Sequence, residues 1–345
     1  LFLGISVLED SGYMARAAFL MDRLMHALGL HGKSFIPLLM GFGCSVPAIM
    51  ATRTLESPRD RIMTTLLVPL MSCSARLPVY VLVAGAFFAE RAGSVVFFMY
   101  VIGIVAAMLV GRLFARTLFR SSPAPFVMEL PPYRLPTAKG LLIHMWERGR
   151  IYLQKMGGVI LVASVILWFL GAFPRDQAVI ETYEGDIMSL RASGAVEEVA
   201  AADALETELA ARLVEDSYIG RAGKAIYPAV RPLGFSWEMG VSLITGFVAK
   251  EVVVSTLGVL YHAEAASGGE HSLAAALRDP SGGVTPLGGF AFMLFVLLYT
   301  PCIVAVIAIK REIGARWMAF SVGYQLVLAW LASFAVYQIG SLIGL

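Results

Sequence analysis

The chain has 345 residues, of which 58% are hydrophobic and only 15% charged, and its mean hydropathy is +0.75. Soluble domains are about 45–50% apolar and about 25% charged, so this composition excludes an ordinary soluble protein and indicates an integral membrane protein. The net charge of +2 gives no reason to expect a nucleic-acid partner, and we expect none.

The chain starts at Leu1 inside an apolar run. We therefore expect it to be the C-terminal part of a longer protein that has no cleavable signal peptide. Residues 1–34 are interpreted as the end of a membrane helix followed by an amphipathic helix at the membrane interface. In the second of these, Met14, Ala18 and Met21 recur at a spacing of three or four residues.

Residues 35–118 are interpreted as a first gate repeat. It begins with a broken apolar segment, residues 35–54, and continues with two segments long enough to cross a membrane, residues 62–88 and 94–118.

Residues 119–173 contain a proline-rich basic connector and a membrane helix at 156–173. Residues 174–238 differ in composition and are interpreted as a polar, acidic helical insertion.

Residues 239–345 are interpreted as a second gate repeat. A second broken apolar segment, residues 239–261, is followed by a polar loop at 262–283 and by two spanning segments at 287–309 and 317–343.

The distribution of basic residues predicts that both broken segments return to the side from which they enter. The basic connector is placed in the cytoplasm, so one crossing at residues 156–173 puts the acidic insertion outside the cell. Both ends of residues 239–261 then lie outside, whereas basic residues on both sides of residues 35–54 place that segment's ends inside. Non-helical backbone at membrane depth is tolerated where protein or a polar cavity satisfies its polar groups.

The two broken segments resemble each other. The stretch GFGCSVPAIMATR (residues 41–53) aligns loosely with GFVAKEVVVSTLG (residues 246–258), and each is followed by an apolar segment with a cysteine near a proline. This pattern predicts an all-α, polytopic membrane protein with two inverted gate repeats that contain broken or re-entrant helices. In secondary transporters with inverted repeats the binding site lies at the repeat interface.

The chain has three cysteines, and they fall in corresponding parts of the repeats. Thiolates are soft ligands that suit Cu(I), Zn(II) or Fe(II) better than Mg(II) or Ca(II). The alternative is that each cysteine is a small buried hydrophobic residue. We predict no catalytic residues and no bound cofactor. The candidate metal ligands are Cys44, Cys73, Cys302, Ser45, Ser72 and Ser74.

Ionisable side chains inside membrane segments are costly and suggest function. For Lys250 and Glu251 the alternative is a structural ion pair or a snorkelling side chain. For the acidic residues at the start of the chain the alternative is a solvated helix. The candidate gating or ion-path residues are Lys250, Glu251, Arg76, Met50, Glu9 and Asp10.

Four segments resemble the membrane domain of the FeoB family of bacterial ferrous iron transporters: LEDSGYMARAAFLMDRLM, GFGCSVPAIMATRTLESPRDR, PLMSCSARLPVY and GFVAKEVVVSTLG. The resemblance implies that Fe(II) is the transported substrate and is taken up across the bacterial cytoplasmic (inner) membrane. In that family the gate cysteines are candidate metal contacts, and their positions match Cys44, Cys73 and Cys302.

The resemblance also implies a preceding N-terminal G domain, with GTP and Mg(II) bound only there. This chain itself is then a transport domain and not an enzyme. The implied partners are membrane lipid, ferrous iron and that G domain, with small Feo accessory proteins and a homo-oligomer as further candidates.

Two other functions stay open from the residues alone. A nucleoside or other organic-solute transporter on a similar gate fold would need amide and carboxylate side chains at the breaks instead of thiols. A membrane enzyme or assembly factor would use the cysteines only for packing.

Overall fold

The computed structural model describes residues 2–119, 133, 136–175, 177–193, 196–261, 270–278 and 284–344. Within these ranges every regular element is a helix and there is no strand, as the composition predicted. Most of the basic connector and most of the polar loop at 262–283 lie outside the described residues.

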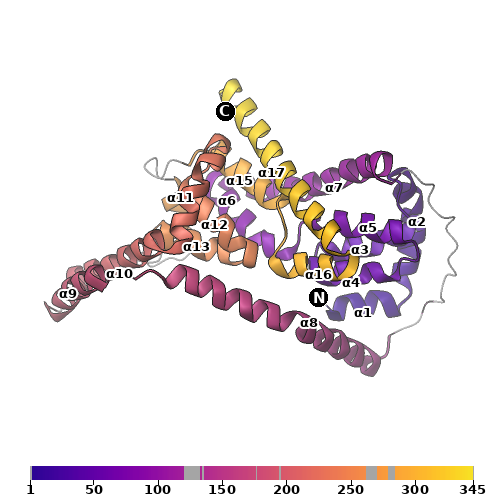
Figure 1. Ribbon diagram of the computed structural model, residues 1–345, viewed down its shortest axis with the longest axis horizontal. Coiled ribbons are helices and arrows are strands. Elements are labelled where there is room, and N and C mark those ends of the chain that lie inside the picture. Colours follow the sequence, from indigo (N-terminus) through magenta and orange to yellow (C-terminus); the bar gives the residue numbers. More distant parts are fainter. Residues whose placement is uncertain are drawn as a thin grey trace. The chain divides into compact units, whose positions relative to one another are not determined.

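The chain forms seventeen α-helices within the part that the structure describes. In chain order they are α1 (Phe2–Asp10), α2 (Tyr13–Ala27), α3 (Phe35–Gly41), α4 (Ser45–Ala51), α5 (Pro58–Leu67), α6 (Leu77–Phe87), α7 (Ala92–Thr117), α8 (Ala138–Ala172), α9 (Gln177–Ser193), α10 (Val196–Asp216), α11 (Tyr218–Val230), α12 (Trp237–Val248), α13 (Val252–Leu260), α14 (Glu270–Arg278), α15 (Pro286–Leu298), α16 (Ile303–Ile313) and α17 (Ala315–Ile343) (Figure 1).

Four helical runs of the described residues are long and apolar enough to cross a membrane: Pro58–Phe87, Ala89–Thr117, Pro286–Ile313 and Ala315–Ile343. A fifth candidate is α8, whose two halves, Ala138–Ile151 and Met156–Ala172, are bent by 46°. These runs coincide, to within one residue at their C-terminal ends or by enclosing them, with the five spans predicted from hydropathy. The chain is therefore a multi-pass helical membrane protein.

The first broken segment folds as a helical hairpin, α3–α4. Its two ends contact consecutive residues of α5: the hydroxyl of Thr64 donates to Ser34 Oγ over 2.9 Å, and the hydroxyls of Thr52 and Thr65 share a hydrogen bond of 3.1 Å. Ser34 precedes α3 and Thr52 follows α4, so the segment returns to the level at which it begins. This is the enter-and-return geometry that the loop charges predicted.

The second broken segment is also a hairpin, α12–α13. Ser236, the N-cap of α12, and Tyr261, the C-cap of α13, share a hydrogen bond of 2.9 Å between their hydroxyls. A second hydroxyl pair, Thr245 and Thr256, joins the two arms over 3.0 Å. In Figure 1 α12 and α13 lie side by side.

Two predicted spans are not continuous helices. In residues 62–88, α5 ends at Leu67 and the backbone is non-helical at residues 71–73 before η4 (Ser74–Arg76) and α6. In residues 287–309, a non-helical stretch at 299–302 separates α15 from α16. Pro301 lies in the second break, where its missing N–H and its ring are incompatible with a helix interior.

The chain divides into two compact units that do not coincide with the two repeats. Each unit combines one hairpin with half of each broken span: the first has α3–α4, α5 and α16, and the second has α12–α13, α15 and α6. The first unit is made of Leu1–Ala75, Phe97–Val162 and Leu297–Leu328, and the second of Arg76–Val96, Ala163–Val296 and Ala329–Leu345.

The acidic insertion is only partly a separate element. Helices α9 and α10 pair through exposed contacts, such as Arg191 with Asp203 and Glu206. Helix α11, by contrast, packs on α12, and Ile219 and Val241 share a buried apolar cluster. Helix α11 thus packs with the second hairpin although it lies within residues 174–238, because it carries an apolar face that the acidic average of those residues conceals.

Candidate functional site

The tip of the first hairpin is joined to the first break. The backbone N–H and the hydroxyl of Ser74 both donate to the Gly43 carbonyl, over 3.3 and 2.8 Å. Gly43 immediately precedes Cys44, and Ser74 immediately follows Cys73. These hydrogen bonds therefore bring two of the predicted ligands to one place in the first unit. Gly41 permits the approach, because a Cβ there would lie 3.0 Å from the Cβ of Met71.

Tyr100 of α7 contacts both sides of this junction. Its ring stacks on Phe42 at the hairpin tip, with 6.1 Å between centroids, and its side chain hydrogen-bonds that of Ser72 at the break. The sequence analysis missed Tyr100. The available signal was a tyrosine in a strongly apolar span, because a buried phenol usually finds a hydrogen-bond partner.

The third cysteine lies at the same end of a parallel helix pair. Helices α4 and α16 pack together and begin directly after Cys44 and Cys302. At their other ends Arg53 donates to Glu312 over 2.7 and 2.5 Å. Because the C-terminal ends meet, the helices run in the same direction, and both N-caps face the same end of the unit.

The three cysteines are thiols, each partly exposed, and each lies in a non-helical position between two helices. In the described part of the chain, however, no three side chains of the His, Cys, Asp or Glu type are grouped so as to hold a metal ion. A complete three-thiol cage is therefore not preassembled, although the elements that carry the thiols are brought together.

The predicted serine ligands have different environments. Ser45 and Ser72 are buried, and Ser72 is engaged with Tyr100, whereas Ser74 is exposed and bonds the hairpin tip. Met50 lies partly buried on α4.

The predicted gating residues of the second unit also differ from one another. Lys250 and Arg76 are almost fully buried, at 2% and 1% exposure, but Glu251, next to Lys250, is exposed. Lys250 lies at the turn of the second hairpin, directly after the extended residue Ala249.

The acidic pair at the start of the chain is only partly described. Asp10 ends α1 and lies 3.4 Å from the imidazole of His144 on α8. The side chain of Glu9 lies outside the described residues.

The sequence analysis gave no role to Glu312, which lies in the last turn of α16. Glu312, whose side chain is 2% exposed, accepts from Arg53 and from Arg61.

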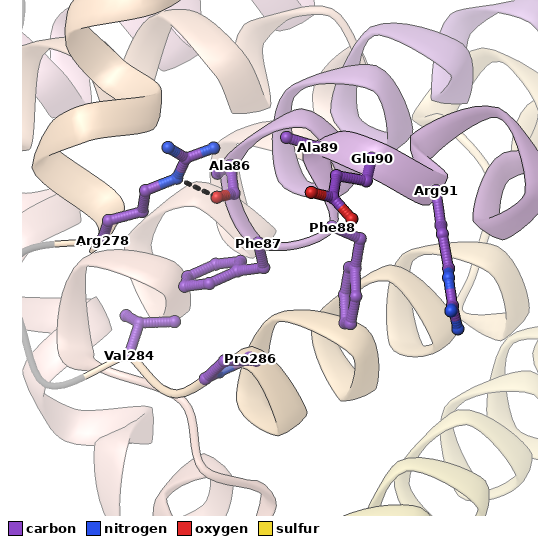
Figure 2. A pocket seen from close by; sticks show the side chains of 9 residues that line it. All are labelled: Ala86, Phe87, Phe88, Ala89, Glu90, Arg91, Arg278, Val284 and Pro286. Atoms are coloured by element: carbon purple, nitrogen blue, oxygen red, sulfur yellow. Dashed lines mark hydrogen bonds between the residues drawn. The ribbon is translucent and has the colours of Figure 1, made fainter.

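A cavity of about 530 Å³ lies in the second unit (Figure 2), and none of its lining residues belongs to the second hairpin, α12–α13. Arg278 crosses one side of it and donates to the carbonyls of Ala86 and Gly85 at the end of α6. None of the predicted site residues lines this cavity, whose lining residues are Ala86, Phe87, Phe88, Ala89, Glu90, Arg91, Arg278, Val284 and Pro286.

The fold and the site together define a multi-pass membrane protein with two compact units, each of which contains a helical hairpin and halves of the broken spans. The Gate family model, described as nucleoside recognition, matches residues 1–87 and 153–316, and a model described as ferrous iron transport protein B C terminus matches residues 96–148. The chain belongs to the Gate family and corresponds to the C-terminal part of FeoB proteins.

Named relatives cover nearly the whole chain. A Porphyromonas gingivalis Fe(2+) transport protein A/Fe(2+) transporter FeoB fusion protein is 52% identical over 99% of this chain and 42% of its own length. The Fe(2+) transporter FeoB of Helicobacter pylori J99 is 40% identical over 96% of the chain and 52% of its own length. The Fe(2+) transporter FeoB of Staphylococcus aureus COL is 40% identical over 99% of this chain and 46% of its own length. The chain thus spans about half the length of these relatives. No solved structure matches it significantly.

Proposed function

We propose that this chain is the membrane part of a ferrous iron transporter and moves Fe(II) into the cell across the bacterial cytoplasmic membrane. The observation that carries the proposal is the hydrogen-bonded junction between Gly43 and Ser74, where two non-helical stretches meet. Cys44 is next to Gly43 in the sequence and Cys73 is next to Ser74, so the junction brings these two thiols to one place. The names of the relatives, each an Fe(2+) transporter, supply the identity of the ion.

In this proposal the ion exchanges water for sulfur and backbone oxygen at the hairpin tip. Broken helices leave carbonyl groups without intrahelical partners, so oxygen ligands are at hand beside the thiols. A closed four-thiolate cage would hold a metal tightly, as in structural zinc sites. Two or three thiols that are not grouped in advance suit an ion that must leave again, and Fe(II) is low in the affinity order of divalent metals.

Movement of the hairpins would expose the site to the two sides of the membrane in turn. We assign the energy source to a GTP-binding domain in the half of the relatives that this chain does not cover, with Mg(II) and hydrolysis confined to that domain. The fusion to transport protein A in the P. gingivalis relative supports a small Feo accessory protein as a partner. A homo-oligomer is a further proposal.

A second candidate follows from the description of the Gate family as nucleoside recognition. A nucleoside requires hydrogen-bonding amides or carboxylates in its pocket. The tip of the first hairpin instead offers Phe42, Gly43, Cys44 and Ser45, so we favour the metal.

The test is uptake of radioactive Fe(II) by cells that express the full protein with each cysteine replaced by alanine, singly and together, at matched membrane abundance. We expect the triple variant to lose uptake and excess nucleoside not to compete with Fe(II). Normal uptake by the triple variant would remove the thiols from the mechanism, and competition by nucleoside would favour the second candidate.

A further inference from the structure

A buried carboxylate fastens together the two helices that begin at Cys44 and Cys302. Arg53, just beyond α4, forms a two-pronged ion pair with Glu312, at 2.7 and 2.5 Å. Arg61 of α5 adds a bond of 2.9 Å to the same carboxylate and one of 3.0 Å to the Glu312 backbone carbonyl.

The burial of Glu312 distinguishes this cluster from ordinary surface ion pairs. Its side chain is 2% exposed, whereas those of Arg53 and Arg61 are 50% and 34% exposed. Glu312 lies in the last turn of α16, where a carboxylate is disfavoured by the negative end of the helix dipole. Both arginines offset this and neutralise the carboxylate by charge-assisted hydrogen bonds.

The cluster also fixes geometry at a distance. Because α4 and α16 run parallel and pack together, a clamp at their C-terminal ends determines how far one helix slides past the other. That slide sets the relative height of the two N-caps, and hence of Cys44 and Cys302. The planar guanidinium of Arg53 binds both carboxylate oxygens, so rotation of either group would break a bond.

We propose that Glu312 is a positioning residue for the thiol end of the first unit: by clamping Arg53 and Arg61 it holds α4 and α16 in one register and so sets the separation of Cys44 and Cys302. The inference rests on the proposed function in that these thiols meet Fe(II). It assigns Glu312 no contact with the ion.

The first measurement follows the separation of the thiols directly. In full-length protein carrying Cys73→Ser, Cys44 and Cys302 are joined by short bifunctional thiol reagents of graded length, with and without Glu312→Gln. We expect Glu312→Gln to slow cross-linking by the best reagent about tenfold, a typical size for coupling between two sites. Arg61 can still donate to the backbone carbonyl in this variant, which helps the fold to persist.

The second measurement follows transport in protein with all three cysteines. We expect Glu312→Gln to raise the half-saturating Fe(II) concentration by about the same factor, with a smaller change in maximal uptake, and Glu312→Asp to restore part of the loss. The matched control is Glu56→Gln, because Glu56 is 86% exposed and pairs with Lys33 in the same unit. This control should leave both measurements unchanged.

Equal cross-linking and equal half-saturation in Glu312→Gln and Glu56→Gln would overturn the proposal. If Glu312→Gln does not reach the membrane, Arg53→Lys replaces it, since lysine keeps the charge but lacks the two-pronged geometry. If the uptake assay shows that the thiols are dispensable, the proposed function fails but the proposal for Glu312 does not. The cross-linking measurement reports on the Glu312 ion pairs in the absence of iron.

Discussion

Cys44 and Ala249 occupy the same place in the two hairpins and adopt the same extended conformation, with φ and ψ of −153° and 130° for Cys44 and −148° and 130° for Ala249. The loose alignment of the two broken segments pairs these residues. The repeat is therefore present in the backbone, but only the first copy carries sulfur at this position.

The equivalence predicts that Ala249→Cys is accommodated. Both positions are partly exposed, so in protein without native cysteines a thiol at 249 should react with a small permeant reagent about as fast as a lone Cys44, since exposure governs access to a thiol. Labelling kinetics in membranes test this. Complete protection of residue 249 beside a reactive Cys44 would contradict structural equivalence at the two turns.

Ser74→Ala tests the junction between the hairpin tip and the first break. The change removes the 2.8 Å hydroxyl bond to Gly43 but keeps the 3.3 Å backbone bond. Loss of one such bond costs about 1 kcal/mol, so we expect uptake to fall partly and Ser74→Thr to restore it. Both variants should be compared at equal abundance. Wild-type uptake in Ser74→Ala would show that the hydroxyl is not needed there.

Lys250 and Glu251 are neighbours in sequence but differ in burial, so their replacements should differ. Lys250→Met removes a buried ammonium and leaves its partner groups unsatisfied, at about 1–3 kcal/mol for each such group. Glu251→Gln alters an exposed side chain and should change thermal stability little. Thermal unfolding of the purified protein measures both. A larger loss for Glu251→Gln would be inconsistent with the burial of Lys250.

The three thiols should not contribute equally to uptake. Cys44 and Cys73 flank a direct hydrogen-bonded junction and have hydroxyl neighbours, whereas the parallel packing of α4 and α16 places Cys302 at the same end. We expect Cys44→Ala and Cys73→Ala each to reduce Fe(II) uptake more than Cys302→Ala. Equal losses, or the reverse order, would count against the junction as the principal contact.

The sequence was sufficient to predict the spans and the two hairpins, because hydropathy and loop charge are properties of local composition. It was not sufficient to predict the breaks within residues 62–88 and 287–309. Their mean hydropathy is that of a continuous helix, and Pro69, Pro78 and Pro301 could each have stood at a helix end.

The site was predicted in part for a similar reason. Cys44, Cys73 and Cys302 were proposed as ligands because thiols in apolar segments are chemically conspicuous, and their role stays a prediction. Tyr100 and Glu312 were missed, because their roles depend on contacts between distant segments: Tyr100 meets Phe42 and Ser72, and Glu312 meets Arg53, which lies 259 residues earlier in the chain. No local pattern records such a pairing.

The most direct test of the account is X-ray absorption at the iron edge of the purified full-length protein loaded with Fe(II) under reducing, anaerobic conditions. The account predicts sulfur in the first coordination shell, diminished in Cys44→Ala and in Cys73→Ala and absent from the triple alanine variant. A first shell of oxygen and nitrogen alone in the unaltered protein, with transport intact, would contradict it.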